Sequence, residues 1–76
     1  MTIQEFIHAF EEALELPNGE VKPETRLADV ERYDSMGRLC VMTMSDKQFG
    51  VLIDADEMDR CQTVSDLYAL VKGLAK

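Results

Sequence analysis

The sequence predicts an all-α protein, a small four-helix bundle with three main helices, one short helix and a long first loop. Two stretches carry hydrophobic residues at steps of three and four, which is the spacing of an amphipathic helix, and capping residues precede each stretch. Between them, an aspartate and a glycine bracket a third, apolar-rich stretch. With 76 residues the chain is near the lower size limit for a self-supporting core, so we expect residues 1–76 to form a single domain.

The first helix is expected to begin after Thr2, because Thr2 and Glu5 fit a capping box. Pro17, Asn18 and Gly19 are expected to end it, since proline cannot continue a helix and Asn-Gly favours a turn. Its apolar stripe consists of Ile3, Phe6, Ile7, Phe10, Ala13 and Leu14. Residues 17–33 then form a long, mostly polar loop, which we expect to be held against the core by Val21, Leu27, Val30 and Tyr33.

The second helix is expected to run from Asp34, a good N-cap, to Phe49, with Gly50 as the residue that ends it. A hairpin is the alternative, with residues 39–44 paired with residues 49–53. We favour the helix because the segment is bracketed by these two residues and is rich in unbranched Met, Leu and Gln.

A short helix is expected after Asp54, with Glu57 three residues further on, and a last helix after Thr63 with Asp66 in the same relation. The apolar stripe of the last helix consists of Val64, Leu67, Tyr68, Val71, Leu74 and Ala75.

The composition limits the possible functions. Fifteen acidic and eight basic residues give a net charge of −7, which repels nucleic acid and anionic membranes and suits partner proteins with basic patches. No apolar run is long enough to insert into a membrane, and no secretory signal is present, so we expect a cytoplasmic protein. A single histidine, His8, without a CxxC pair argues against a zinc site. We expect Cys40 and Cys61 to be packing or surface residues.

No catalytic constellation is present, so the chain is not expected to be an enzyme. The most informative feature is Asp34-Ser35-Met36-Gly37, which stands between the long loop and a helix. An Asp-Ser pair alone caps many helices and says little about function. Four segments together, however, resemble acyl carrier proteins in order and spacing over nearly the whole chain: Glu24–Val30, Tyr33–Gly37, Phe49–Ile53 and Thr63–Leu67.

This resemblance implies that the fold is that of an acyl carrier protein, here of a stand-alone type. It also implies that a phosphopantetheinyl transferase moves 4'-phosphopantetheine from coenzyme A onto Ser35, and that the arm then carries a thioester-linked group. The partners would be this transferase, an acyl- or aminoacyl-loading ligase, and downstream transferases or synthases. Asp34 would help to present the serine, and the protein would be a monomer that serves as a substrate of other enzymes.

The second helix has more apolar residues than one face can hold. We expect Val41, Met42 and Phe49 to face the core, with Ser45 between them. Met36 and Leu39 are then expected on the outer side with Ser35, where they would contact partner enzymes. Crowded core packing is the alternative for these two residues. The acids expected at the partner surface lie further along the chain: Asp54, Asp56 and Glu57.

The second helix also departs from the fatty-acid type of carrier, which usually has an acidic second helix. Arg38 and Lys47 are expected to present positive charge there instead, so we expect a carrier specialised for one pathway. The residues from Asp34 to Gly37 and from Glu57 to Arg60 also resemble D-alanyl carrier proteins, although the Trp and Thr-Pro-Asn that typically follow are absent. Two alternatives therefore stay open: an aminoacyl carrier, and an unmodified helical module that binds a partner through Met36 and Leu39.

Overall fold

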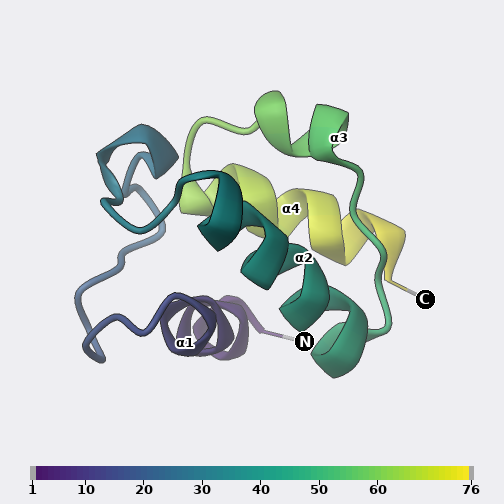
Figure 1. Cartoon of the computed structure of the whole chain (residues 1–76). Coiled ribbons are helices and arrows are strands. Elements are labelled where there is room, and N and C mark those ends of the chain that lie inside the picture. Colours follow the sequence, from purple (N-terminus) through teal and green to yellow (C-terminus); the bar gives the residue numbers. More distant parts are fainter. Residues whose placement is uncertain (1, 76) are drawn as a thin grey trace.

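The structure is a computed structural model that describes residues 2–75. It contains four α-helices, α1 (Ile3–Ala13), α2 (Ser35–Phe49), α3 (Ala55–Asp59) and α4 (Val64–Leu74), and a single 3-10 turn, η1 (Leu27–Asp29). Figure 1 shows α1 beside both α2 and α4, with the short α3 above them and the long first loop at one end. The described residues contain no strand, and residues 39–44 lie inside α2, so the all-α prediction is confirmed and the hairpin alternative is wrong.

The helices begin where local capping chemistry predicts. The Thr2 hydroxyl accepts a hydrogen bond from the Glu5 backbone N–H, and the Glu5 carboxylate accepts one from the Thr2 N–H at 2.8 Å. Thr63 and Asp66 form the same reciprocal pair at the start of α4. The Asp54 carboxylate caps α3 more weakly, through the Asp56 N–H at 3.4 Å. These bonds satisfy backbone donors that have no partner within the helix.

The end of α1 differs from the prediction. The helix ends at Ala13, several residues before the expected stop at Pro17–Gly19. Glu15 takes a left-handed conformation with φ of 57°, its N–H bonds to the Glu12 carbonyl, and the Leu16 N–H bonds to the Glu11 carbonyl at 2.8 Å. This is a Schellman end, in which the helix closes on itself before the proline is reached. The end of α2 is as predicted, because Gly50 is left-handed with φ of 66°.

The core is centred on Phe6, which is fully buried. Its ring lies 6.3 Å from that of Phe10, 6.2 Å from that of Phe49 and 5.8 Å from that of Tyr68, so one side chain of α1 joins α2 and α4. Aromatic pairs at such centroid distances contribute beyond the area that they bury. Other large core side chains are Ile53, Met58, Leu67, Val64 and Val71.

The inward face of α2 is rotated relative to the prediction. Val41 and Ser45 are fully buried, as expected, but their companions on this face are Gly37 and Met44. Met42 and Phe49 are only partly buried against the core. Residues 37, 41, 44 and 45 follow the three- and four-residue spacing of one helical face, which leaves the other apolar residues of α2 at its margins.

Two sets of contacts fix the long loop. On α1, Glu11 is only 2% exposed, and its carboxylate accepts a hydrogen bond from the Val21 N–H at 3.0 Å. At the start of α4, the backbone N–H groups of Leu27, Val64 and Ser65 bond to the carbonyls of Gln62, Thr25 and Pro23 at 2.8 to 3.0 Å. Val21 and Leu27 are buried, as predicted, and Val30 and Tyr33 are partly buried. The long loop therefore has a defined position against α1 and the start of α4.

None of the helices in the described part of the chain has the length and apolar character needed to span a membrane.

Candidate functional site

Ser35 is the first residue of α2, at the point where the long loop ends. Asp34 is its N-cap, as predicted, and the Asp34 carboxylate accepts a hydrogen bond from the Gly37 N–H at 2.9 Å. Both Asp34 and Ser35 are exposed. The N–H groups of Ser35 and Met36 belong to the first helical turn, where no intrahelical acceptor exists. The Ser35 hydroxyl therefore stands in open solvent at the positive end of a fifteen-residue helix.

Gly37 brings the loop onto the first turn of α2. It is buried, and a β-carbon at this position would overlap the Arg32 carbonyl oxygen and lie 3.1 Å from the Leu14 side chain. This close approach sets the direction in which the chain enters α2, and with it the position of Ser35. Sequence reasoning named Gly37 as part of the motif that begins at Asp34 but gave it no role in packing. A glycine within the first turn of a capped helix lowers the stability of that helix. Its presence there was the available sign that the position has no room for a side chain.

Tyr33 fixes the end of the long loop, next to the start of α2. Its ring lies 6.1 Å from that of Phe10, and its hydroxyl is buried with no hydrogen-bond partner among the described residues. Burial raises the pKa of Tyr33 above its ordinary value, and the positive charge of Arg38 opposes this rise. Two residues before Ser35, the loop is thus anchored in the core.

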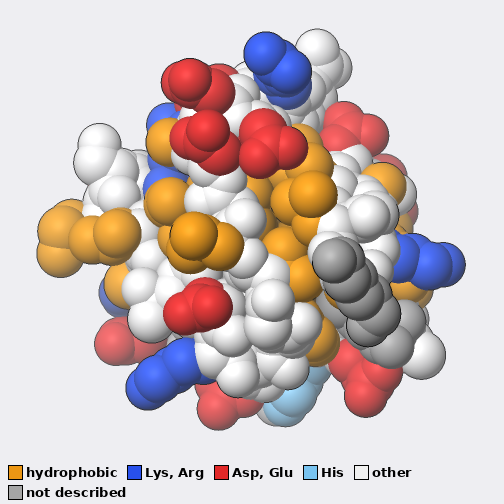
Figure 2. All heavy atoms as spheres, turned by 90° about the vertical axis from the view of Figure 1, so that its right-hand side faces the viewer, with side chains coloured by type: hydrophobic (Ala, Val, Ile, Leu, Met, Phe, Trp, Pro, Cys, Tyr) orange, Lys and Arg blue, Asp and Glu red, His pale blue; other side chains and the backbone are white. Residues whose placement is uncertain are grey.

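Two exposed apolar residues lie on the same helix as Ser35. Met36 is 70% exposed and Leu39 is 56% exposed, so the prediction that they lie outside the core is confirmed. Leu52, in the connection between α2 and α3, is 77% exposed and was not predicted. Figure 2 shows hydrophobic side chains on one face of the molecule below the acidic side chains at the level of α3. Exposed apolar side chains that gather on one face are typical of contact surfaces.

The predicted acids lie on and before α3. Asp54 is its N-cap and Asp56 and Glu57 stand in its first turn; the two aspartates are exposed and Glu57 is partly buried. The structure thus brings these acids together on α3, and it places Asp34 and Met36 at the start of another helix, α2.

Arg38 connects these two helices, which corrects the expectation that it presents positive charge to partners. Its guanidinium contacts the Asp59 carboxylate and donates to the Ala55 carbonyl at 3.0 Å. Its side chain is only 29% exposed. Lys47, in contrast, is exposed and has no ion-pair partner within residues 2–75.

Within the described range, no group of three or more His, Cys, Asp or Glu side chains is placed to hold a metal ion. His8 lies on α1, 3.8 Å from the Glu12 carboxylate, at an exposed site. Cys40 is exposed, Cys61 is partly buried, and both are free thiols.

The comparisons with known proteins agree with this site. Residues 4–71 match the family model described as the phosphopantetheine attachment site. Comparisons with curated proteins and with solved structures give no match. Proteins of this family carry 4'-phosphopantetheine covalently, are modified by phosphopantetheinyl transferases, and act as substrates for biosynthetic enzymes rather than as catalysts. An exposed serine hydroxyl at a helix N-terminus fits a phosphodiester, because free N–H groups and the helix dipole favour its negative charge. The chain therefore belongs to the phosphopantetheine-attachment family of carrier proteins.

Proposed function

We propose that Ser35 bears the 4'-phosphopantetheine arm, and that residues 1–76 act as one carrier domain that moves thioester-linked acyl groups between enzymes of a single biosynthetic pathway. The observation that carries this proposal is the exposed Ser35 hydroxyl at the first position of α2, capped by Asp34 and held in place by the packing of the loop on Gly37. We also propose a cytoplasmic location, which the two free cysteines suit.

Attachment of the arm requires this chain to supply only the Ser35 hydroxyl. The Ser35 oxygen forms a bond to the phosphorus that carries the pantetheine of coenzyme A, and 3',5'-adenosine diphosphate leaves with the electrons of the broken P–O bond. The hydroxyl proton passes to a base outside this chain. The attached arm supplies a thiol that holds cargo as a thioester. The first turn of α2 stabilises the new phosphodiester through its dipole and N–H groups.

We propose a partner surface with an apolar centre and an acidic border. Met36 and Leu39 form the centre beside Ser35, and Asp34 contributes a carboxylate at the same end of α2. The border on α3 consists of Asp54, Asp56 and Glu57. A loading ligase and a downstream transferase or synthase with basic rims around an apolar recess would complement this surface. Because the acids lie on α3 and not along α2, enzymes that dock on an acidic second helix would fit poorly.

The attachment site can be tested by intact-mass spectrometry. The protein is incubated with coenzyme A, magnesium and a broad-specificity phosphopantetheinyl transferase, beside a reference carrier that shows the transferase to be active. Ser65→Ala is the matched control, since Ser65 is an exposed serine in the first turn of another capped helix, α4. We expect wild type and Ser65→Ala to gain one phosphopantetheinyl group, and Ser35→Ala to gain none. An unchanged wild-type mass would contradict the carrier function and favour an unmodified interaction module.

A further inference from the structure

A hollow of about 380 Å³ lies between α1 and the long loop. Small-molecule sites have volumes of about 300–1,000 Å³, so this hollow is large enough for a small ligand. Its wall on α1 consists of residues that share one helical face, since they are spaced three or four positions apart. They are Gln4, Ile7, His8 and Glu11. The loop contributes residues 18–19 and 21–23.

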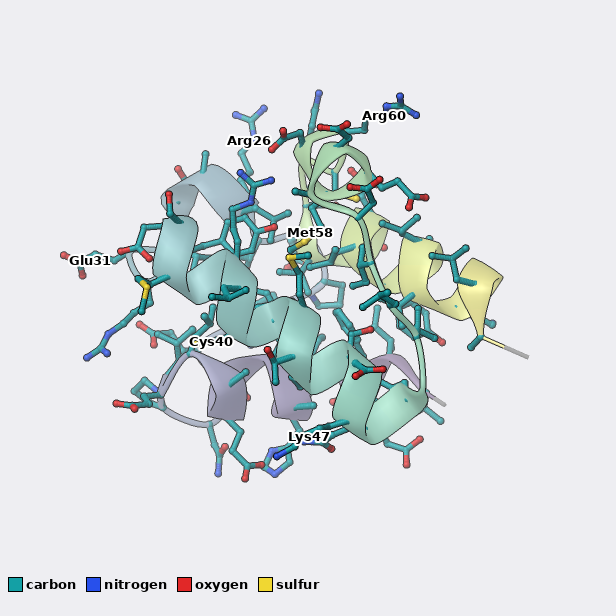
Figure 3. All side chains as sticks on the ribbon, turned by 45° about the vertical axis from the view of Figure 1, so that its right-hand side comes forward. Arg26, Glu31, Cys40, Lys47, Met58 and Arg60 are labelled. Carbon is teal, nitrogen blue, oxygen red and sulfur yellow. The ribbon has the colours of Figure 1, made fainter. Side chains whose placement is uncertain are left out.

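The hollow lies on the side of α1 that faces away from α2. Ala13 of α1 lies on the opposite side, where it lines a space together with Cys40 of α2. Figure 3 shows Cys40 and Lys47 on the edge of α2 that faces α1. At about 100° per residue, Glu11 lies about 200° around the helix from Ala13. A ligand in the hollow would therefore not cover α2 or Ser35.

Glu11 gives the hollow a buried negative charge. Its Oε2 accepts a hydrogen bond from the Val21 N–H at 3.0 Å, and its other carboxylate oxygen has no hydrogen-bond or ion-pair partner within residues 2–75. A carboxylate that leaves water loses its hydration, and one neutral N–H group replaces only part of it. An ammonium group in the hollow would supply both a positive charge and the missing donor.

Lys22 places a positive charge at the rim of the same hollow. It is exposed, and its side chain has no ion-pair partner in the described part of the chain. Its backbone is fixed, because its N–H donates to the Thr25 hydroxyl at 2.9 Å. The other titratable group of the wall, His8, has its Nε2 3.8 Å from the carboxylate of Glu12, which does not line the hollow.

The remaining wall is apolar. Ile7 and Val21 are buried and Pro23 is partly buried, and all three line the hollow. The hollow thus combines a buried carboxylate, a cation at its rim and an apolar wall. A free α-amino acid has the complementary set of groups: an ammonium, a carboxylate and a side chain on one carbon atom.

We infer that this hollow binds a free α-amino acid with an apolar side chain. The ammonium group of the ligand pairs with Glu11, and its carboxylate pairs with Lys22. Its side chain lies against the apolar wall. A zwitterion fits better than a simple amine, because Lys22 repels an amine that carries no negative charge. The ligand is held without a covalent bond, so this site is independent of the proposed attachment at Ser35.

Binding can be measured by NMR titration of the full-length, isotope-labelled protein with L-leucine, through the backbone amides of Gly19 and Val21. N-acetyl-leucine, which has no ammonium group, and leucinamide, which has no carboxylate, test the two ends of the ligand separately. We expect saturable shifts with leucine and a Kd of roughly 1 mM. Each analogue should bind about tenfold more weakly, because each lacks one charge-assisted hydrogen bond.

Three variants assign the binding to the hollow. Glu11→Gln should weaken leucine binding about tenfold, and its amide oxygen can still accept from the Val21 N–H, so the loop keeps its contact. Glu20→Gln is the matched control, since it removes the same charge from an exposed loop position outside the lining. It should leave binding unchanged. Lys22→Gln should weaken the binding of leucine but not that of leucinamide.

The absence of a saturable shift with leucine, up to about fifty times the expected Kd, would overturn the inference. Equal binding of leucine and leucinamide would overturn it as well, because the site would then recognise an amine alone. Equal weakening by Glu11→Gln and Glu20→Gln would show that only net charge matters, which also contradicts it. None of these outcomes depends on modification of Ser35, so the proposed function stands or falls on its own test.

Discussion

Gly37 is where the long loop and α2 come closest, so it offers a direct test of the junction below Ser35. In Gly37→Ala the new methyl group would overlap the Arg32 carbonyl oxygen, and the backbone has to move apart. We expect the free energy of unfolding to fall by roughly 1–3 kcal/mol, the usual cost of forcing a group into a packed site. Urea denaturation measures it.

Gly73→Ala is the control for Gly37→Ala. Gly73 lies in α4 with no atom within 4 Å of the position that a β-carbon would take. Alanine is a better helix former than glycine, so this change should raise the free energy of unfolding by up to about 1 kcal/mol. Equal stability changes in the two variants would mean that the approach to Arg32 does not constrain the fold.

Tyr33 makes stability depend on alkaline pH. Because burial raises the pKa of Tyr33 in the folded protein, the folded state keeps the phenol proton that the unfolded state releases. Stability from this residue is therefore fully present below about pH 10, the ordinary tyrosine pKa, and is lost as the pH rises through the folded value. Tyr33→Phe should lose less stability above pH 10, because phenylalanine has no phenol proton to release.

The measurement is the urea midpoint between pH 7 and pH 11. Burial also raises the pKa of the Cys61 thiol, so both proteins should carry Cys61→Ser. If the urea midpoints of the two proteins change with pH in parallel, the pKa of Tyr33 is the same in the folded and unfolded states.

Among the helices, α3 depends most on contacts with the rest of the protein for its stability. A five-residue helix is too short to be stable alone. The buried Met58 and the Arg38 guanidinium, which contacts Asp59 and the Ala55 carbonyl, hold it against the bundle. Arg38→Ala should therefore speed amide exchange at Met58 and Cys61 about tenfold, with little change in α4.

Arg60→Ala is the comparison for Arg38→Ala, because Arg60 carries the same charge at an exposed position with no ion pair among the described residues. Hydrogen exchange followed by mass spectrometry or NMR distinguishes the two variants. Faster exchange in both to the same extent would show that charge alone, and not the contact with α3, is responsible.

The starts of the helices were predictable from sequence because capping is local. Thr2 with Glu5, and Thr63 with Asp66, find their partners three residues away, so the pattern contains the whole interaction. The end of α1 was not predictable in the same way. Proline marks where a helix must have stopped, whereas the Schellman turn at Glu15 stops it earlier without a glycine.

The residues that position Ser35 were harder to predict, because their partners are distant in sequence. Asp34 was assigned from local chemistry, and the exposure of Met36 and Leu39 is confirmed. The burial of Glu11 depends on Val21 returning to α1, which no local pattern shows. Likewise, no residue near Arg38 in the sequence indicates that its side chain pairs with a carboxylate. The contact with Asp59 forms only when α3 packs against α2. That Ser35 is the attachment residue stays a prediction.

At the scale of the whole molecule, the net charge of −7 should make stability depend on salt. Of the acids on α1, Glu11 is buried, so repulsion arises from exposed ones such as Glu12 and from Asp54, Asp56 and Asp59 at α3. Raising the salt from low to moderate concentration should raise the melting temperature by a few degrees, because screening weakens this repulsion.

Magnesium chloride and sodium chloride at equal ionic strength should have the same effect on the melting temperature, since residues 2–75 contain no cluster suited to a metal ion. Thermal melts followed by circular dichroism provide the measurement. A melting temperature independent of salt would contradict the repulsion, and a larger effect of magnesium would reveal a divalent site.

The bonds between the long loop and the start of α4 have a consequence for synthesis of the protein. Thr25 and Leu27 are held by Val64 and Gln62, which the ribosome makes more than thirty residues later. A nascent chain that ends before these residues has Ser35 but lacks the backbone contacts that hold the loop leading to it. We therefore expect the proposed attachment at Ser35 to require the last helix, so that unfinished chains are poor substrates for the transferase.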